Sequence, residues 1–574
     1  MAQSNDVFLK SLRRAALAST ALLIFPAMAL AIDVPGPANP GRVNQRFQSV
    51  PVNPPKVTSP TIAKPALSVP APQGSDKVFL TLKSLEIKGM SAYQSREFEP
   101  LYRDLIGTRV ALSKIYDIAS AISDRYHADG YALAKVSVPD QRIGDGAVRL
   151  VVVEGYIDSV NVKAPKVTQD KLKSRVEKIL AIRPFNVRKL ERQLLLMNDL
   201  YGITVRSVIE PRAKSGASGA IDLTLLVKKE KTTTDVSFDN FGSRPLGQEQ
   251  VGARHTRGLG LLPFDKLSMG GFVSTQISEL QYVFLGYEFP ISDAGTKFGI
   301  STNASWTEPG YPLKQNQLKG NSYNAEFNLS HPVVRSRSQN LTVSGVFDLQ
   351  QSKNDALSTL LFEDKIRTLR FGGVYDVADS WGGTNLMDAR VSQGLDVLGA
   401  TKTGSANLSR EDAHSDFTKL EASFARWQGI TRAWTLYASV SGQAASAPLP
   451  SAEEFGYGGQ VYGRAYNASE ITGDDGAAGS VELRYAGLPP LPWPGGRLEP
   501  FGFYDFGVVH NRDNFTENDT ESGASAGFGT RFSVTESVDG SLTLAFPLTL
   551  PVAIPSPGGN SGSGRVFFSL NYSL

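Results

Sequence analysis

The segment YNAEFNLS at residues 323–330 alternates strictly between apolar and polar side chains. Side chains of a strand point alternately to its two faces, so the odd-numbered apolar residues would share one face and the even-numbered polar residues the other. Largely the same alternation recurs at 341–350 and in the last residues, 565–574. It indicates strands between an apolar and a polar environment, which fits both a soluble sandwich and a membrane barrel.

The number of such segments favours the barrel. Sixteen can be placed between Lys231 and Leu574, separated by Gly, Asn, Asp, Ser and Pro. They lie near 233–241, 248–258, 265–275, 279–289, 296–307, 320–331, 339–351, 365–378, 385–396, 414–427, 431–444, 477–487, 497–510, 522–535, 538–548 and 563–574. An even number of strands is typical of a transmembrane barrel, because open strand edges cannot face lipid. We therefore predict a sixteen-stranded antiparallel barrel over 230–574, surrounded by outer-membrane lipids.

The connections have a consistent polarity. Those after even-numbered segments are mostly short, whereas those after odd-numbered segments include 308–319, 352–364 and 445–476. Bacterial barrels have short periplasmic turns and longer external loops. This places the long connections outside the cell and the residues before the barrel in the periplasm.

Composition excludes several functional classes. The chain of 574 residues has a formal net charge of only +3, so nothing in it suggests binding to nucleic acid. The absence of cysteine excludes disulfides, thiolate metal sites and cysteine nucleophiles.

The N-terminus predicts export. Basic residues precede an apolar run from Ala15 to Ala31 that ends in small residues suited to cleavage, so residues 1–31 are expected to be a signal peptide. A retained anchor is the alternative, but Pro26 interrupts the run. Residues 32–76 are rich in proline and should form an extended linker, with a short helical turn at 40–47 as the alternative.

Two copies of a small β-α-α-β-β module follow, at 77–155 and 156–229. In the first we expect a strand at 80–87, helices at 95–106 and 113–129, and strands at 133–138 and 147–154. The second should have a strand at 157–162, helices at 168–180 and 187–200, and strands at 203–209 and 220–228. Ser113 is a suitable N-cap and Gly130 a suitable left-handed residue after the helix.

Seven segments in order resemble one family. They are VPDQRIGDGAVRLVVVEGYID (138–158), FDNFGSRPLGQ (238–248), HPVVRSRSQNL (331–341), FARWQ (424–428), FGYGGQVYGRAY (455–466), ELRY (482–485) and FGFYDFG (501–507). Over about 78–574 the chain resembles the two-partner secretion transporters of the haemolysin-activator type, whose periplasmic modules are polypeptide-transport-associated (POTRA) domains. The resemblance implies a monomeric translocator in the outer membrane of a Gram-negative bacterium. It would capture a large unfolded exoprotein, a β-helical adhesin or haemolysin, in the periplasm and secrete it through the barrel without ATP.

The resemblance also implies a functional loop. In the family the connection corresponding to 445–476 folds back into the barrel and carries a Val-Arg-Gly-aromatic motif, which aligns here with Gly463, Arg464, Ala465 and Tyr466. Alanine in place of the family glycine is restricted at positive φ, so the loop tip should differ from the usual conformation. Family members often carry an N-terminal helix that plugs the barrel, but the proline content of 32–76 does not favour a long helix here.

Asp505 is the expected partner of Arg464. In the strand 497–510 it shares a face with Phe503, and this face should point into the lumen because a charge facing lipid is costly. The resemblance implies a direct pair between Asp505 and the loop arginine. A general solvated lumen network around Asp505 is the alternative.

A client site is expected in the first module. The strand from Ala134 through Val136 to Val138, beside the helix 113–129, could accept an extended client by β-augmentation. The alternative is that these apolar side chains belong to the module's core.

Sequence patterns for catalysis are weak. Gly523-Ala524-Ser525-Ala526-Gly527 matches the G-x-S-x-G pattern, but it lies inside an alternating strand and not between a strand and a helix. The five histidines have no spacing typical of a metal site, and no phosphate-binding motif occurs. We therefore expect no enzyme activity, metal or cofactor. An outer-membrane insertase, a passive porin and a surface hydrolase using Ser525 are the alternatives to secretion, with the insertase the strongest.

Overall fold

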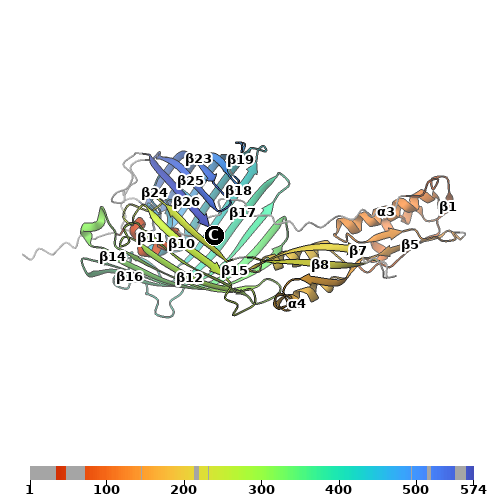
Figure 1. Cartoon of the computed structure of the whole chain (residues 1–574), viewed down its shortest axis with the longest axis horizontal. Helices are drawn as coiled ribbons and strands as arrows, with labels where there is room; N and C mark the ends of the chain where they lie inside the picture. Colours follow the sequence, from red (N-terminus) through yellow and green to blue (C-terminus); the bar gives the residue numbers. More distant parts are fainter. Residues whose placement is uncertain are drawn as a thin grey trace, which may run out of the picture. The chain divides into compact units, whose positions relative to one another are not determined.

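The structure, a computed structural model, describes residues 34–46, 71–143, 145–211, 219–230, 232–492, 494–512, 519–549 and 564–574. Two small modules precede a barrel (Figure 1). The predicted signal peptide 1–31 lies outside the described residues. No helix among the described residues is long and apolar enough to cross a membrane.

The barrel consists of sixteen antiparallel strands in a closed ring, as predicted. Its strands are β9 (Thr233–Asp239), β10 (Gln250–Arg257), β11 (Lys266–Ser274), β12 (Gln281–Pro290), β13 (Lys297–Thr307), β14 (Lys319–Arg335), β15 (Gln339–Ala356), β16 (Thr359–Ala378), β17 (Gly383–Gly394), β18 (Thr418–Gly429), β19 (Trp434–Ala445), β22 (Asp475–Tyr485), β23 (Arg497–His510), β24 (Thr520–Ser533), β25 (Val538–Pro547) and β26 (Arg565–Ser573). The last strand pairs with the first, Ser569 with Asp239 and Ser573 with Asp235. Every barrel strand therefore has a neighbour on both sides.

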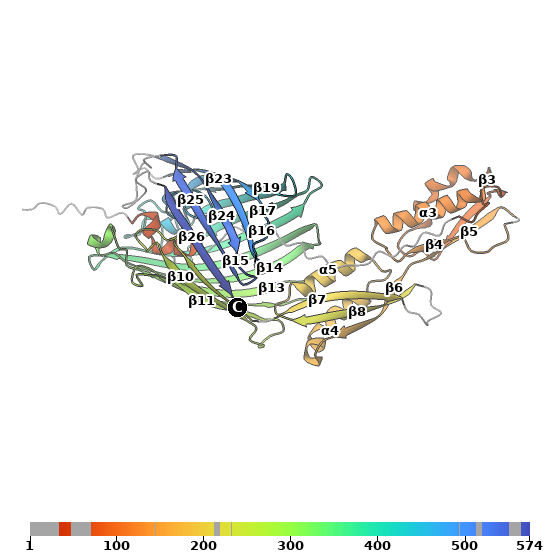
Figure 2. The ribbon, with the colours of Figure 1, turned by 45° about the horizontal axis from the view of Figure 1, so that its top comes forward.

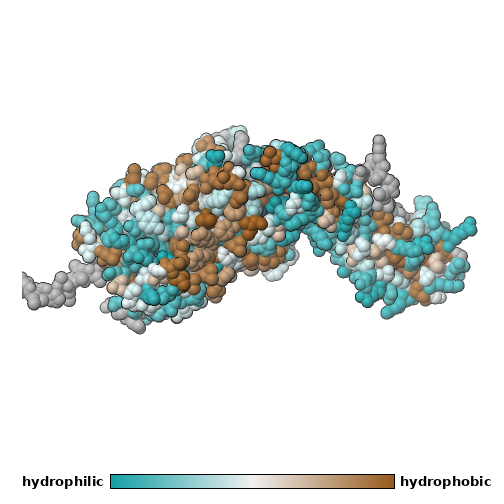
Figure 3. Space-filling model, turned by 90° about the horizontal axis from the view of Figure 1, so that it is seen from below, coloured by the Kyte–Doolittle hydropathy of each residue, from teal (hydrophilic) through white to brown (hydrophobic). Residues whose placement is uncertain are grey.

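The alternation sorts the side chains between the outer surface and the lumen. On β14 Tyr323, Phe327 and Leu329 are exposed on the outside, whereas Asn324 is buried inside. Figure 3 shows hydrophobic residues gathered on the barrel surface, in brown, with hydrophilic residues beyond them. Such a surface buries its apolar side chains in lipid and keeps the polar ones around the lumen.

One predicted connection is wrong. The segment 352–364 is not a loop, because β15 continues to Ala356 and β16 begins at Thr359. Leu357 and Ser358 form the turn, with φ of 50° and 66°. The polar composition suggested a loop, but a strand that extends beyond the membrane can be polar on both faces and still pair.

The two ends of the barrel are distinguished by the chain path. β9 begins at Thr233, shortly after the last strand of the second module, β8 (Ala220–Lys229), so its start lies at the module end of the barrel. Because neighbouring strands are antiparallel, the connection between β19 and β22 belongs to the opposite end.

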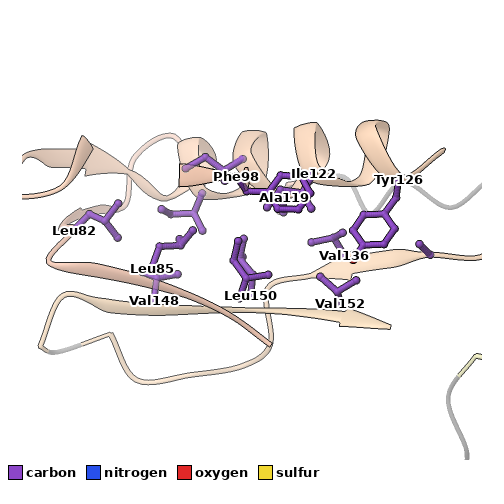
Figure 4. Packing of buried hydrophobic residues seen from close by; sticks show 14 of the residues in the cluster. Leu82, Leu85, Phe98, Ala119, Ile122, Tyr126, Val136, Val148, Leu150 and Val152 are labelled. Atoms are coloured by element: carbon purple, nitrogen blue, oxygen red, sulfur yellow. The ribbon is translucent and has the colours of Figure 1, made fainter. Parts of the chain in front are cut away.

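In the first module the helix α3 (Leu112–Ala128) covers a sheet of β2 (Ser84–Lys88), β5 (Ala147–Val153) and β4 (Lys135–Ser137), in the order β2-β5-β4. Figure 4 shows Ile122 and Tyr126 of the helix pointing towards Leu150, Val136 and Val152 of the sheet. β1 (Phe79–Thr81) pairs separately with β3 (Arg109–Ala111). The predicted single strand at 80–87 is thus interrupted between β1 and β2.

Two other predictions for this module are wrong. Residues 95–106 form three 3₁₀ turns, η3 (Ser95–Glu97), η4 (Glu99–Leu101) and η5 (Arg103–Leu105), instead of an α-helix. Pro100 lacks a backbone N–H and restricts the residue before it, which limits helix growth. Ser113 lies inside α3, where Ala111 occupies the N-cap position without a side-chain cap. Gly130 has the predicted positive φ, 93°.

The second module has the predicted β-α-α-β-β order. β6 (Tyr156–Lys163), β8 and β7 (Ile203–Pro211) form a sheet in the order β6-β8-β7. The helices α4 (Lys166–Leu180) and α5 (Val187–Asn198) contribute Leu172, Leu190 and Leu194 to its core.

Residues 35–46 fold against the barrel wall and the β19–β22 connection, contrary to the prediction of a plain linker (Figure 2, red). They form η1 (Gly36–Ala38), η2 (Pro40–Arg42) and α2 (Val43–Arg46). Proline at the starts of η1 and η2 limits both to short turns. The alternative of a helical turn near 40–47 was therefore correct for the described part. The segment is held by buried polar contacts: Gln350 of β15 donates to Gly41, and Arg42 donates to Ser451.

Candidate functional site

The connection 446–474 between β19 and β22 folds back into the lumen, as expected for 445–476. It begins with η7 (Ser451–Glu453) and contains a small hairpin of β20 (Phe455–Tyr457) and β21 (Ile471–Gly473). The hairpin packs on β22 and β23, and its tip carries Gly463, Arg464, Ala465 and Tyr466. We call residues 446–474 the lumen loop.

Arg464 and Asp505 form a bidentate pair. Nε of Arg464 donates to Oδ2 of Asp505 at 3.0 Å, and Nη2 donates to Oδ1 at 2.8 Å. The backbone N–H of Arg464 also donates to Oδ2 of Asp505, at 3.0 Å. The Asp505 side chain is 0% exposed, which places it in the barrel interior as predicted. A paired carboxylate at this depth fixes both the side chain and the main chain of the loop tip.

Two neighbours complete the environment of Arg464. Nη1 contacts Glu482 of β22 at 2.7 Å, and Nη2 donates to Ser480 at 2.9 Å. The guanidinium stands over the ring of Phe503, 3.5 Å from its centroid. Planar stacking with two carboxylate partners is a property of arginine that lysine does not share.

Ala465 leaves the tip intact because the positive φ lies elsewhere. Gly463 has a φ of 77°, and Ala465 is not among the residues with positive φ. Ala465 is instead fully buried beside Tyr457 and Phe503. The glycine that the tip requires is therefore Gly463, and the alanine fits a position with ordinary backbone angles.

Aromatic side chains of the lumen loop pack on small residues of the barrel wall. The single hydroxyl proton of Tyr466 is shared between the carbonyls of Ala524 and Thr549, at 3.0 and 2.8 Å. The ring of Tyr457 covers Gly507 of β23 and Gly523 of β24, where an added Cβ would come within 2.2 and 2.5 Å of it. The glycines let the loop approach the wall closely.

A second ion-pair cluster holds the start of the loop, and the sequence analysis missed it. Glu453 pairs with Arg370 of β16 at 2.6 Å and with Lys419 of β18 at 2.8 Å. Arg370 also contacts Asp348 of β15 at 3.3 Å. A signal existed: charged residues such as Arg370 inside alternating strands must face the lumen. Alternation does not indicate which loop carboxylate meets them.

The N-terminal segment contacts the lumen loop through Arg42. Its Nη1 donates to the carbonyl of Ser451 at 2.6 Å, its Nη2 donates to the hydroxyl of Ser469 at 3.2 Å, and Glu454 lies 3.9 Å away. Gln45 donates to the carbonyl of Ala452 at 2.7 Å. Loop and segment therefore fill the same part of the lumen.

In the first module the predicted client strand is β4 and its flanks. Ala134 and Val136 are buried in the module's core, where Figure 4 shows Val136, and Val138 packs against that core. The alternative, that these apolar side chains belong to the module's core, is therefore correct for the side chains. Its main chain remains available, because β4 is an edge of the sheet β2-β5-β4.

Glu154 is a further residue that the sequence analysis passed over, although it lies in one of the quoted segments. Its carboxylate accepts from the backbone N–H of Ser91 and Ala92, at 3.0 and 2.9 Å, and from the Tyr126 hydroxyl at 2.7 Å. Burial raises the pKa of Glu154, but these hydrogen bonds lower it by more, so the pKa lies below its usual value of 4.5.

The remaining motifs do not form a catalytic site. Ser525 is buried in β24, and its hydroxyl lies 3.4 Å from Asp505 in the network of the loop arginine. Among the described residues no group of three or more His, Asp or Glu could hold a metal ion.

Comparison with protein families identifies the chain. The model of the haemolysin secretion/activation protein ShlB/FhaC/HecB matches residues 219–531, more than half of the sequence. The chain belongs to this family. The ShlB-type POTRA domain matches residues 80–155, the first module. The ShlB/FhaC/HecB family consists of two-partner secretion transporters of the outer membrane, which are not enzymes, and its POTRA domains are periplasmic. The module end of the barrel is therefore the periplasmic end.

Relatives and solved structures agree with this assignment. The heme/hemopexin transporter protein HuxB of Haemophilus influenzae (strain 86-028NP) is 24% identical over 428 residues, 72% of either chain. The outer membrane transporter CdiB of Dickeya dadantii (strain 3937) is 22% identical over 454 residues, 75% of this chain and 76% of that one. The structure of CdiB from Escherichia coli has a TM-score of 0.73 at 18% identity, covering 89% of this chain and 93% of that chain. CdiB from Acinetobacter baumannii has a TM-score of 0.63 at 16% identity, covering 92% and 96%. These structures share the fold.

Proposed function

We propose that this transporter captures a large unfolded exoprotein of the adhesin or haemolysin type in the periplasm and passes it through its barrel without ATP. The bidentate pair of Arg464 and Asp505 carries the proposal, because it fixes the lumen loop against one side of a closed barrel. A loop held in this way narrows the lumen without filling it.

One cavity that remains in the lumen is mainly polar. A cavity of about 520 Å³ lies between the lumen loop and the wall formed by β14 to β19. It is lined by amides and by charges of both signs, including Asn324, Arg390 and Glu421. Such a lining suits an unfolded chain, whose backbone groups need hydrogen-bond partners that an apolar channel would withhold.

Capture would use the edge of β4. A free strand edge offers main-chain donors and acceptors, which bind an extended segment with little regard to its sequence. Folding of the exoprotein outside would give the direction, because a folded chain cannot return through the lumen. One chain suffices to close the barrel, so we propose a monomer.

The proposal is tested with the purified full-length protein in lipid vesicles. Unfolded exoprotein is added on the side of the POTRA domains without nucleotide, and its protection from added protease is measured. We expect protection that does not change when ATP is supplied. Protection that appears only with ATP would refute the proposal that the exoprotein passes through the barrel without ATP.

An outer-membrane insertase is the second candidate function. An insertase would need the barrel to open between the strands β26 and β9. This seam is the shortest in the barrel, Ser569–Ser573 with Asp235–Asp239. Thr234 and Leu574 extend it, because the main-chain N–H of each donates a hydrogen bond to the carbonyl of the other. The main-chain N–H of Asn240 also donates to the carbonyl of Phe568. The seam is thus hydrogen-bonded along the whole of β9, which favours export through the lumen. Depletion of the protein that lowered many other barrel proteins at once would favour the insertase.

A further inference from the structure

The N-terminal segment has main-chain carbonyl groups that accept hydrogen bonds from the barrel. Three of the residues at its start, Pro35, Pro37 and Pro40, have no backbone N–H. This stretch therefore has an excess of acceptors over donors, and buried carbonyls need donors from elsewhere.

Side chains of the barrel supply these donors. The Ser243 hydroxyl donates to the carbonyl of Pro37 at 3.1 Å, the Ser305 hydroxyl to that of Pro40 at 3.3 Å, and the Gln350 amide to that of Gly41 at 2.8 Å. Ser305 lies on β13, Gln350 on β15, and Ser243 in the connection after β9. All three donors are buried.

These three contacts do not depend on the side chains of the segment. Each donor binds a main-chain oxygen, which every residue of any polypeptide possesses. The contrast is Arg42, whose own side chain makes the contact with the lumen loop. A row of donors that binds carbonyls would hold another extended chain as well as this one.

Further donors continue the row on both sides of the segment. The cavity of about 520 Å³ begins at Gly41 and is lined by Asn328 and Ser344, which lie nearer the periplasmic end of β14 and β15 than Gln350 does. In the other direction Asn354 shares the face of Gln350 on β15; it is fully buried, and its side chain makes no hydrogen bond within the described part of the chain.

We propose that Ser305, Gln350, Ser344 and Asn354 form a binding track for the main-chain carbonyls of an extended polypeptide. The segment 35–46 occupies the middle of this track, at Ser305 and Gln350, in the resting barrel, and the exoprotein takes over these donors during passage. This inference rests on the proposed function, because it requires the exoprotein to pass through the lumen.

A cross-linking experiment tests where the exoprotein passes. The chain has no cysteine, so Ser344→Cys and the control Ser541→Cys each introduce one reactive position in the full-length protein. Ser541 lies on β25, facing the lumen, with Ser569 as its partner. A photoreactive maleimide reagent is attached, and an exoprotein fused to a stably folded domain is stalled in the barrel.

We expect adducts of the exoprotein with Ser344→Cys and few with Ser541→Cys. Equal adducts at both positions would overturn the track while leaving secretion through the lumen in place. Adducts at neither position, with exoprotein bound at the membrane, would contradict the proposed function itself.

A substitution distinguishes a track that binds the exoprotein from a set of residues that only hold the N-terminal segment in place. Gln350→Met keeps the side-chain size and removes the donor. Loss of one hydrogen bond should loosen the segment and raise the resting ion conductance, and it should also lower the export rate roughly two- to tenfold. Ser541→Ala is the matched control and should change neither quantity. Higher conductance with unchanged or faster export would show that Gln350 only holds the segment.

Discussion

At the scale of single residues, Arg464 stabilises the loop tip because its charge, its shape and its backbone N–H all engage neighbouring groups. Asp505 is fully buried, so the carboxylate depends on this one residue for most of its hydrogen bonds. Leaving one partner of such a pair buried alone costs roughly 3–5 kcal/mol. The pair therefore holds the tip of the lumen loop in place.

Replacing Arg464 by alanine should leave membrane insertion near normal and lower export about tenfold or more, since the loop loses its anchor. Arg464→Lys should restore only part of the activity, because lysine keeps the charge without the planar fork. The measurements are the amounts of barrel in the membrane and of exoprotein in the medium. Arg497→Ala, at an exposed arginine of β23, is the control.

The same pair predicts non-additive losses. Once Arg464 is replaced, removal of Asp505 should add little, because the two residues act through one contact. Losses that multiply in the double variant would mean that the residues act independently.

Glu154 gives the first POTRA domain a dependence on pH. Its pKa is lowered in the folded state, so its contribution to stability is present above the ordinary value of 4.5 and is lost as the pH falls through the folded value. Hydrogen exchange at the amides of Ser91 and Ala92 should therefore accelerate below that pH. Glu154→Gln should remove this pH dependence, whereas Glu99→Gln, at an exposed position of the same domain, should keep it. Exchange that is independent of pH after intrinsic rates are subtracted would contradict this role.

At the scale of secondary structure elements, the hairpin β20–β21 packs on the strands β23 and β24 because a large side chain of the hairpin meets positions without a side chain in the strands. Tyr457 needs the absence of a side chain at Gly507 and at Gly523. Small residues in these strands therefore let the lumen loop pack closely on the wall, which is a structural role for Gly523, the first glycine of the G-x-S-x-G pattern.

We predict that Gly523→Ala displaces the hairpin and lowers export several-fold, because an added methyl group in a filled site typically costs about 1–3 kcal/mol. Gly502→Ala on β23 is the control, since the nearest atom to its added Cβ lies at 3.9 Å. Proteolysis of the loop in vesicles reports the displacement directly. Adding Tyr457→Ala should relieve the effect of Gly523→Ala on loop protection; no relief would mean that the two residues do not clash.

At the scale of the whole molecule, the first module and the barrel bury separate sets of side chains, whereas Leu133 of the first module and Phe264 of the β10–β11 connection pack against the core of the second module. The first module buries Ile115, Ile122 and Leu150 among its own elements, while the barrel closes through its own strand pairs. The barrel can therefore keep its fold when the modules are removed, because its ring closes without them.

Deletion of residues 78–228 should leave a barrel that inserts into the membrane but exports no exoprotein, because capture and passage belong to different domains. Insertion is checked by the shift in gel mobility between unheated and boiled samples, which a closed hydrogen-bonded ring should give. Export at the normal rate from the shortened protein would show that the POTRA domains are dispensable for capture.

The sequence by itself determined the number of barrel strands, their faces and the second module. These properties follow from local patterns: alternation shows which side of a strand each residue faces, and helical spacing shows which side of a helix is buried. The same local information placed Asp505 in the lumen, whereas its pairing with Arg464 was implied only by resemblance to a family.

Only the tertiary structure decided how the lumen is filled. The contacts of Glu453 with Arg370 and Lys419, and of Arg42 with Ser451, join residues far apart in the sequence. The alternation predicts that such side chains point into the lumen. The residues that they contact depend on strand register and on the paths of the lumen loop and of the N-terminal segment through the barrel. The polar residues at 352–356 likewise predict a loop from their composition, whereas they are strand residues paired with 319–322 of β14 and with 359–364 of β16. Long-range closure of the ring brings these groups together, and no local pattern encodes it.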